Sequence, residues 1–239
     1  MRKLISLLVK RGNMGKKEDY RRKQQTARKR NQTILLALII VATIAIAAII
    51  IVPNIQAVGK VVQVTPLARP QADGMSTGDP NAPIKVDVYS DFQCPACKSF
   101  AENYEPTIIS QYVETGKVYL TYHPFRIIGP ESDGAAAAAY CASEQNKFWE
   151  YHDVLFANQT GEEVGDFTDK RLKAYAELVN LDQTKFNQCY SSGKYRTQVQ
   201  QSQTDGNQRG VSFTPSVFVN NVLVEDGSFN AAIERALAQ

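Results

Sequence analysis

The chain has 239 residues, which is enough for one ordinary domain with additional segments or for two small domains, but not for a larger array. Its net charge of +3 hides an asymmetry, because residues 1–32 contain twelve Lys and Arg against two Asp and Glu, so the remainder must carry −7 (+3 − 10). This division argues against one uniform environment for the chain and predicts two.

Residues 33–52, TILLALIIVATIAIAAIIIV, form an apolar run of twenty residues without charge, Pro or Gly. As a helix the run would be about 30 Å long, which matches the hydrocarbon thickness of a bilayer. A buried core helix is usually shorter and apolar on one stripe, and a cleaved signal peptide has a shorter apolar region followed by small residues. The sequence therefore predicts a retained transmembrane helix.

The basic segment at residues 1–32 predicts the topology. Lys and Arg beside a membrane helix remain on the cytoplasmic side, so the N-terminus is expected in the cytoplasm and the chain after Pro53 outside it. A basic segment of this kind also resembles a nucleic-acid patch. Its place beside a membrane helix makes topology and contact with anionic lipid the simpler interpretation, and no nucleic acid is expected as a partner.

The chain after the membrane helix begins with a predicted linker at residues 53–81, which contain several Pro, Gly and small polar residues. Alternation of apolar and polar residues then predicts a strand at 84–90. A helical pattern follows the strand, with Pro106 expected to kink or divide it. A second strand is expected at 117–123, which completes a β-α-β unit.

A long helical tract occupies about residues 129–209 and is followed by two strands, SVFVN and VLVE, with a short turn at residues 220–221. A helix closes the chain. The order β-α-β, helical block, β-β-α predicts an α/β fold, namely a thioredoxin fold with a helical insert, for residues 82–239.

The four cysteines do not suit a structural zinc site, which usually needs two C-x-x-C or C/H pairs. Only Cys94 and Cys97 form such a pair, since Cys141 and Cys189 are 48 residues apart. The two histidines are isolated and are expected to be structural; they are His123 and His152. We expect no metal and no cofactor.

The CPAC pair instead predicts redox chemistry. Cys94 follows a strand and opens a helix, where first-turn N–H groups and the helix dipole stabilise a thiolate. Cys97 lies one turn further and is expected to be more buried. Cys94 would exchange with a substrate through a mixed disulfide that Cys97 resolves. An inert structural disulfide is the alternative, which the strand–helix junction disfavours.

The placement of all four cysteines beyond the apolar run indicates an oxidising compartment. There, Cys141 and Cys189 are expected to form a structural disulfide between two helices of the insert. Such a crosslink contributes on the order of 4 kcal/mol by chain-entropy arguments. Four cysteines permit three pairings, so the sequence alone leaves the connectivity open.

Three separated segments, YSDFQCPAC, KFWEYHDVLFANQ and GVSFTPSVFVN, resemble the DsbA family of thiol–disulfide oxidoreductases in its membrane-anchored form. The resemblance covers residues 82–239, with the motifs in the expected order. It implies a thioredoxin fold with a helical insert and the transfer of disulfides to newly secreted proteins. It also implies that Cys94 is the nucleophile and Cys97 its resolving partner.

The same resemblance assigns roles around the pair. Pro95 and Ala96 set the redox poise, Pro215 is the cis-proline beside the site, and Thr214 tunes the site and presents its backbone to an extended substrate. The chain departs from several relatives at Ala96, where they have His, and at Phe213, where Gly is common. The first change removes a group that would stabilise the thiolate, and the second affects the width of the substrate groove.

Asp91, three residues before Cys94, has more than one possible role. As a partly buried acid it would serve proton transfer to Cys97. Equally, it would cap the active-site helix or face water. The residues do not decide between these roles.

Three functions remain open, of which we favour the first. It is a single-pass membrane enzyme of the cell envelope that introduces disulfides into secreted or envelope proteins; the resemblance implies a membrane redox partner of the DsbB or VKOR type. The second is a disulfide reductase or isomerase on the same fold, since potential and partner decide the direction. The third is a peptide-binding or chaperone module with a structural disulfide.

Overall fold

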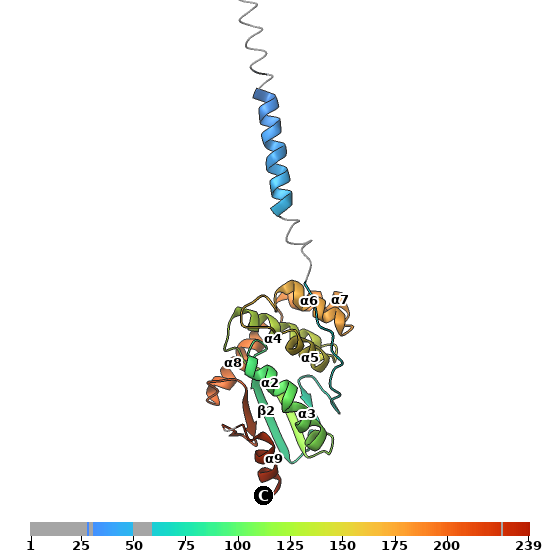
Figure 1. Ribbon diagram of the computed structural model, residues 1–239, viewed down its shortest axis with the longest axis vertical. Helices are drawn as coiled ribbons and strands as arrows, with labels where there is room; N and C mark the ends of the chain where they lie inside the picture. The colour runs from blue at the N-terminus through green and yellow to red at the C-terminus, as the bar shows by residue number, and fades with distance from the viewer. Residues whose placement is uncertain (1–27, 29–30, 50–58, 226) are drawn as a thin grey trace, which may run out of the picture. The chain divides into compact units, whose positions relative to one another are not determined.

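The computed structural model describes residues 28, 31–49, 59–225 and 227–239, in two units (Figure 1). The N-terminal unit contains a helix at Asn31–Ile49 with a mean hydropathy of 2.6, which by length and composition is able to cross a membrane. None of its side chains is buried in protein. The predicted span is therefore helical in its described part, whereas residues 50–52 and most of the basic segment lie outside the described residues.

The second unit is built on a mixed sheet of five strands in the order β1-β3-β2-β4-β5. The central strand β2 runs parallel to β3 and antiparallel to β4, so β2 is hydrogen-bonded on both edges. Both short outer strands, β1 and β5, pair antiparallel with their neighbours. The strands span β1 Ser76–Thr77, β2 Ile84–Ser90, β3 Val118–Pro124, β4 Ser216–Val219 and β5 Val222–Leu223.

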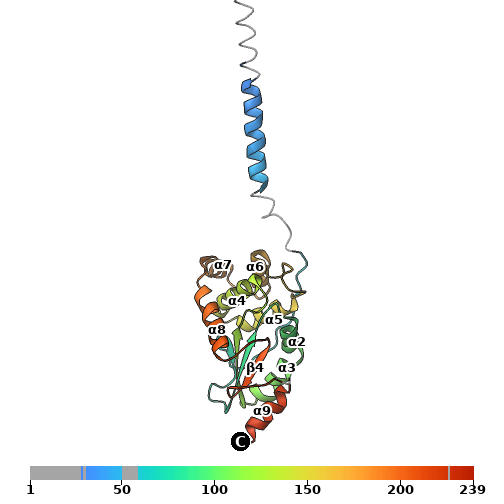
Figure 2. The ribbon, with the colours of Figure 1, turned by 90° about the vertical axis from the view of Figure 1, so that its left-hand side faces the viewer.

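Helices cover both faces of this sheet, with α2, α3 and α9 on one side and α8 on the other (Figure 2). The predicted α/β order of a β-α-β unit, a helical block and a β-β-α unit is confirmed by the order of the elements. Their bounds are α2 Pro95–Asn103, α3 Glu105–Ile108, a π-helix at Ile109–Val113, α4 Pro130–Ser143, α5 Phe148–Ala157, α6 Asp169–Leu178, α7 Gln183–Ser192, α8 Arg196–Gln208 and α9 Phe229–Leu237.

Pro106 divides the first helical segment, as the sequence predicts. Helix α2 ends at Asn103, and Pro106 lies in the first turn of α3, where its missing N–H removes no helical hydrogen bond. The segment then continues as a π-helix to Val113. Phe100 of α2 and Ile108 of α3 are both buried, so both pieces pack on the domain core.

Strand β2 separates two hydrophobic clusters because its side chains alternate between the faces of the sheet. Val86 and Val88 belong to the main core with α2, α3 and α9. Tyr89 points to the other face, where it joins a small cluster with Phe125, Val211 and Phe218. The loop after β3 and the segment after α8 are thereby packed together against β2.

The described part of the expected linker lies on the domain, which differs from the expected spacer. We call residues 61–70 the strap. Its backbone is held by side chains of α5 and its C-cap: Leu67 N–H donates to Asp153 Oδ2 of α5 at 2.7 Å, and Val62 N–H donates to Oδ1 of the C-cap Asn158 at 2.7 Å. An irregular segment held by side chains has no periodicity, so the sequence pattern does not reveal it. Residues 53–58 lie outside the described residues.

Arg69 of the strap is buried between two carboxylates of the domain. Its guanidinium contacts Glu105 of α3 and donates to both oxygens of Asp153 at 2.9 and 2.8 Å. It also lies over the ring of Trp149, 4.4 Å from the centroid. Burial alone would lower the pKa of Arg69, but Glu105 and then Asp153 outweigh it and raise that pKa. Burial alone would raise the pKa of Asp153, but hydrogen bonds from His152 and then Arg69 outweigh it and lower that pKa. The strap therefore neutralises charge inside the domain.

Within the helical insert, a disulfide joins Cys141 of α4 to Cys189 of α7, with 5.8 Å between the Cα atoms. The two residues are separated by 48 positions in the chain. Four small residues on α4 are completely buried, which brings α4 close to its neighbours; they are Ala135, Ala138, Ala139 and Ala142.

Candidate active site

The CPAC motif lies at the junction of β2 and α2. β2 ends at Ser90, and Cys94 is the N-cap of α2, with extended backbone angles of φ −75° and ψ 121°. Its carbonyl accepts the N–H of Lys98 at 3.1 Å, which closes the first helical turn. Pro95 fits the first helical position, since its ring fixes φ and its missing N–H is not needed there. Sulfur at an N-cap faces the free N–H groups of the helix.

The two thiols of the motif are not joined, so the structure represents the dithiol form. Cys97 is completely buried and Cys94 is 8% exposed, whereas Pro95 and Ala96 between them are exposed. The Cys94 thiol donates to the carbonyl of Thr214 at 3.4 Å. A reactant therefore reaches Cys94 more easily than Cys97.

The pKa values of the two thiols move in opposite directions. A hydrogen bond from the Cys97 thiol is the main cause that lowers the pKa of Cys94 to about 6, against the opposing effect of burial, and Thr214 and the N–H groups of Cys97 and Ala96 add to it. Burial, followed by the neighbouring Cys94, raises the pKa of Cys97 well above its ordinary value. Near neutral pH the pair therefore consists of one thiolate and one thiol.

The Thr214–Pro215 peptide bond is cis, and the Thr214 carbonyl just before it contacts the Cys94 thiol. Ser216 begins β4 and pairs with Tyr89 of β2, while its hydroxyl donates to the carbonyl of Phe213 at 2.7 Å. The Thr214 hydroxyl is buried and is one of the groups that lower the pKa of Cys94. A hydroxyl donor beside the sulfur stabilises the thiolate over the thiol.

Exposed apolar side chains lie on three loops that adjoin the motif. Phe213 precedes Thr214 and is 41% exposed, and Ile127 lies in the loop after β3. Val164 lies beside Glu163, a residue that hydrogen-bonds the segment before Cys94. A hollow of about 350 Å³ is lined by residues 125–129 of the β3 loop together with residues 211–212. Of these loops, the one that carries Phe213 also carries Thr214, whose carbonyl contacts the Cys94 thiol.

Asp91 is 2% exposed and has three backbone donors. Its Oδ1 accepts the N–H of Gln93 at 2.9 Å, and its Oδ2 accepts the N–H groups of Ile127 and Ile128 at 2.8 and 3.0 Å. No described hydrogen bond joins Asp91 to Cys97. The carboxylate thus fastens the β3 loop to the residues before Cys94. Its part in proton transfer stays a prediction.

Gln93, directly before Cys94, was not singled out by the sequence pattern, yet it is completely buried. Its amide donates to the Ser132 hydroxyl at 2.9 Å and to Glu163 at 2.6 Å, and its carbonyl accepts the N–H of Glu163 at 2.6 Å. Gln159 adds a bond from its amide to the Phe92 carbonyl at 3.0 Å. These amides fix the helical insert to the thiol-bearing segment. Its partners lie 39 and 70 positions away in the chain, so the sequence pattern held no signal for this role.

Both histidines have structural surroundings, as expected. His152 is completely buried, packs on the rings of Phe92 and Tyr122, and has Nδ1 2.9 Å from Asp153 Oδ1. His123 on β3 stacks on Tyr89 with 4.5 Å between ring centroids. Neither histidine has a described contact with a thiol.

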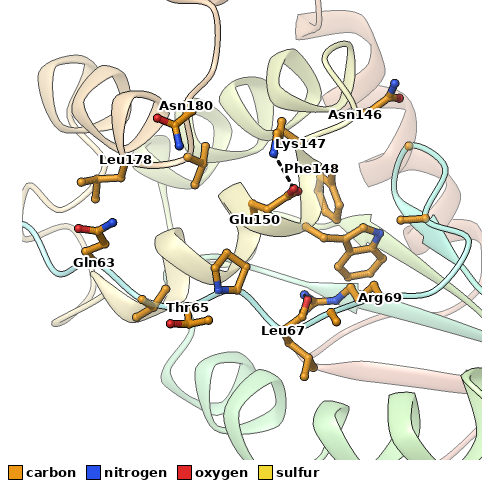
Figure 3. A pocket seen from close by; sticks show the side chains of 17 residues that line it. Gln63, Thr65, Leu67, Arg69, Asn146, Lys147, Phe148, Glu150, Leu178 and Asn180 are labelled. Atoms are coloured by element: carbon orange, nitrogen blue, oxygen red, sulfur yellow. Dashed lines mark hydrogen bonds and ion pairs between the residues drawn. The ribbon is translucent and has the colours of Figure 1, made fainter.

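A cavity of about 590 Å³ lies apart from the thiols, between the strap, the start of α5 and the end of α6 (Figure 3). Gln63 and Thr65 line it from the strap, and Leu178 and Asn180 line it from the other side. Neither Cys94 nor the Thr214 loop contributes to its lining. The Cys141–Cys189 disulfide lies in the insert and does not contribute either, so this cavity is no part of the thiol site.

Comparison with known proteins agrees with this geometry. Residues 71–238 match the family model described as Thioredoxin. A probable disulfide bond formation protein D from Bacillus cereus is 30% identical over 168 residues, which cover 68% of this chain and 78% of that protein. The structure of BdbD from Bacillus subtilis, 21% identical, shares the fold with a TM-score of 0.65 over 76% of this chain and 100% of that one.

Reduced DsbA from Mycobacterium tuberculosis is 27% identical, with a TM-score of 0.57 over 70% of this chain and 94% of that structure. The predicted α/β thioredoxin-type fold is confirmed by these matches. The chain belongs to the thioredoxin family and, within it, to the DsbA-type thiol–disulfide oxidoreductases.

Proposed function

We propose that this protein is a membrane-anchored oxidase that introduces disulfides into secreted or envelope proteins through Cys94 and Cys97. The observation that carries the proposal is the opposite shift of the two thiol pKa values at the start of α2. Cys94 is the accessible sulfur with the lowered pKa, and Cys97 is the buried sulfur that keeps its proton. Disulfide exchange needs one such exchanging and one such resolving sulfur.

The reaction begins with the Cys94–Cys97 disulfide. A substrate thiolate attacks Cys94 Sγ, the bond to Cys97 breaks, and Cys97 leaves as a thiolate that takes up a proton. A second substrate thiolate then attacks the substrate sulfur of the mixed disulfide, and Cys94 leaves as a thiolate. The substrate gains a disulfide and loses two electrons, which remain on the protein dithiol.

The leaving group supports this direction of exchange. A thiol of low pKa leaves readily and stabilises the reduced protein, which makes the disulfide form a stronger oxidant. Ala96 supplies no imidazole to the thiolate, but the Cys97 thiol and two backbone N–H groups act in its place. Pro95 and Ala96 are exposed beside Cys94 and so are placed to touch the substrate.

Substrates are proposed to bind as extended segments along the Thr214–Pro215 loop. The Cys94 thiol contacts the Thr214 carbonyl, so a chain that pairs with this backbone would hold its own sulfur near Cys94. Phe213, directly before Thr214, and Ile127, whose N–H bonds Asp91, are exposed and offer apolar contacts to an unfolded chain. Such contacts suit many sequences, since newly secreted proteins share exposed apolar residues.

The location of the reaction is proposed from the N-terminal segments. Residues 33–52 would anchor the chain as a single membrane span, with the basic residues 1–32 in the cytoplasm and residues 82–239 outside it. Each turnover leaves the dithiol, so a membrane oxidase of the DsbB or VKOR type is needed to accept two electrons. The apolar helix and the thiol pair support this arrangement.

Trapping of mixed disulfides tests the proposal. Cys97 can release a bound substrate by attacking Cys94 in the mixed disulfide, and Cys97→Ser removes this route. The full-length variant should therefore accumulate covalent complexes with envelope proteins, which reductant releases. The matched control Cys94→Ser should accumulate none, because the accessible sulfur is absent. Equal yields from both variants would contradict the assignment of the two cysteines, and no complexes from either would favour a peptide-binding module.

A further inference from the structure

The two halves of the active site are carried by separate parts of the chain. Strand β2 leads into Cys94, whereas α8 leads into Thr214 five residues after its C-cap, Arg209. The two halves meet at the contact between the Cys94 thiol and the Thr214 carbonyl. Whatever holds the end of α8 to β2 therefore sets the geometry at the sulfur.

Arg209 makes that connection. One terminal nitrogen of its guanidinium donates to Asp87 Oδ2 and to the Tyr89 hydroxyl, both at 3.1 Å, and both partners belong to β2. The other terminal nitrogen donates to Asn221 Oδ1 in the turn after β4 at 3.2 Å. The guanidinium also lies over the ring of Phe218 on β4, 4.2 Å from the centroid. One side chain thus ties the end of α8 to both central strands.

Neighbouring contacts support the bonds between Arg209 and β2. The Tyr89 hydroxyl donates to Asp205, one turn earlier in α8, and His123 contacts the other oxygen of Asp87 at 2.9 Å. The pKa of Asp87 lies below its usual value because the hydrogen bonds from His123 and Arg209 outweigh burial. The Arg209 and Asp87 side chains are each 22% exposed, so solvent screens this pair only in part.

The segment between Arg209 and Thr214 is packed as well as tied. Val211 is buried in the cluster of Tyr89, Phe125 and Phe218. Gly206 permits the close approach of α8, because a Cβ there would lie 2.6 Å from the Phe125 ring. Two exposed residues, Ser212 and Phe213, lie between the buried Val211 and Thr214.

We propose that Arg209 is a positioning residue of the active site: by joining the end of α8 to Asp87 and Tyr89 on β2, it holds the Thr214 side chain beside Cys94. The inference rests on the proposed function only in that Cys94 is the exchanging sulfur. Arg209 touches neither thiol and acts through Thr214. Without it, Thr214 moves away from the sulfur, and the thiolate loses the Thr214 hydroxyl as a hydrogen-bond donor.

The test uses the full-length reduced protein in dodecyl maltoside and the variants Arg209→Ala and Arg209→Lys. Arg171→Ala is the matched control, since Arg171 is similarly buried and bonds an acid and a tyrosine within the helical insert, at Asp166 and Tyr175. For each protein, thiolate absorbance at 240 nm gives the pKa of Cys94, with Cys94→Ser as the blank. The alkylation rate with iodoacetamide at pH 6 and the thermal unfolding midpoint complete the set.

The expected result for Arg209→Ala is a rise of about one unit in the Cys94 pKa, which lowers the thiolate fraction at pH 6 about fivefold and the alkylation rate with it. Arg209→Lys should recover part of this shift, because an ammonium still reaches Asp87 but makes fewer bonds. Arg171→Ala should leave the pKa unchanged, even if its unfolding midpoint falls.

An unchanged pKa in folded Arg209→Ala, with only a lower unfolding midpoint, would overturn the inference and leave a purely structural ion pair. If Arg209→Ala does not fold, Asp87→Asn gives the same decision, since it removes the charge that Arg209 binds. A wild-type protein without a thiolate at neutral pH would instead contradict the proposed function. The two failures are therefore distinguishable.

Discussion

Arg69 and Glu105 form an ion pair in which each side chain is only 2% exposed, and this pair joins the strap to the helix that follows the active-site helix. Asp153 on α5 completes the site by accepting hydrogen bonds from both terminal nitrogens of the guanidinium. The catalytic domain therefore includes residues of the strap, which precede the first strand of its sheet. The sequence pattern predicts a spacer here, yet this segment supplies the cation that pairs with two carboxylates inside the domain.

Removal of this cation should be costly. Arg69→Ala leaves Glu105 and Asp153 buried without their partner, and loss of one partner from a buried pair costs about 3–5 kcal/mol. Urea denaturation of the variant should show this loss in the free energy of unfolding. Deletion of residues 1–74, which removes the strap, should lower the free energy of unfolding by at least as much. The control is Arg126→Ala, whose partner Asp133 is about half exposed. Equal stability of both variants would contradict the account of the strap.

The alkylation rate of reduced Cys94 should be proportional to the fraction of Cys94 that is thiolate. Its rate with iodoacetamide should rise with pH, reach half its maximum near pH 6 and remain constant above about pH 7.5, because the pKa of Cys94 is about 6. Cys97→Ala should move the midpoint to higher pH, since the Cys97 thiol is the main cause of the lowered pKa. A midpoint near pH 8.5 in the wild-type protein would show that no thiolate is stabilised.

The stability of the reduced protein should depend on pH with a definite sign. A thiol whose pKa is lower in the folded than in the unfolded chain stabilises the fold above the unfolded value, and this contribution is lost as the pH falls through the folded value. For Cys94 the window runs from an ordinary value of about 8.5 down to about 6. The unfolding midpoint of the reduced protein should therefore rise across this window relative to Cys94→Ser. If the unfolding midpoints of the wild-type protein and Cys94→Ser change equally with pH, the lowered pKa of Cys94 is contradicted.

Asp91→Asn separates the two roles left open for this residue. An amide oxygen accepts backbone N–H groups less strongly than a carboxylate, so three bonds weaken and the free energy of unfolding should fall by about 1–3 kcal/mol. If Asp91 only fastens the β3 loop, the rate at which Cys97 resolves a preformed mixed disulfide should change less than twofold at pH 7. A loss of more than about tenfold at unchanged fold would assign proton transfer to Asp91.

The sequence predicted the elements whose signals are local. The strand at Ile84–Ser90 alternates, the break at Pro106 follows from its ring, and Cys94 stands between strand and helix, so these features were readable without contacts. The resemblance supplied Thr214 and Pro215, which the strand and helix patterns alone do not mark.

The contacts that hold the site were not readable, because they join residues far apart in the chain. Arg69 lies in a segment without periodicity, and its partners at 105 and 153 carry no spacing signal. Gln93 bonds a residue 70 positions away, and Arg209 bonds one 122 positions away. A single polar residue in a linker, a motif or a helix end has the same pattern whether it is buried or solvated, and only the folded chain decides.

The most direct test of the central claim is the reduction potential of the Cys94–Cys97 pair. The full-length protein in dodecyl maltoside, which keeps Arg69, is equilibrated in glutathione buffers while differential alkylation confirms that Cys141 and Cys189 remain oxidised. A potential well above the thioredoxin value of about −270 mV, toward about −120 mV, is the predicted result for a disulfide donor. A potential at or below about −270 mV would contradict the oxidase and identify a reductase instead.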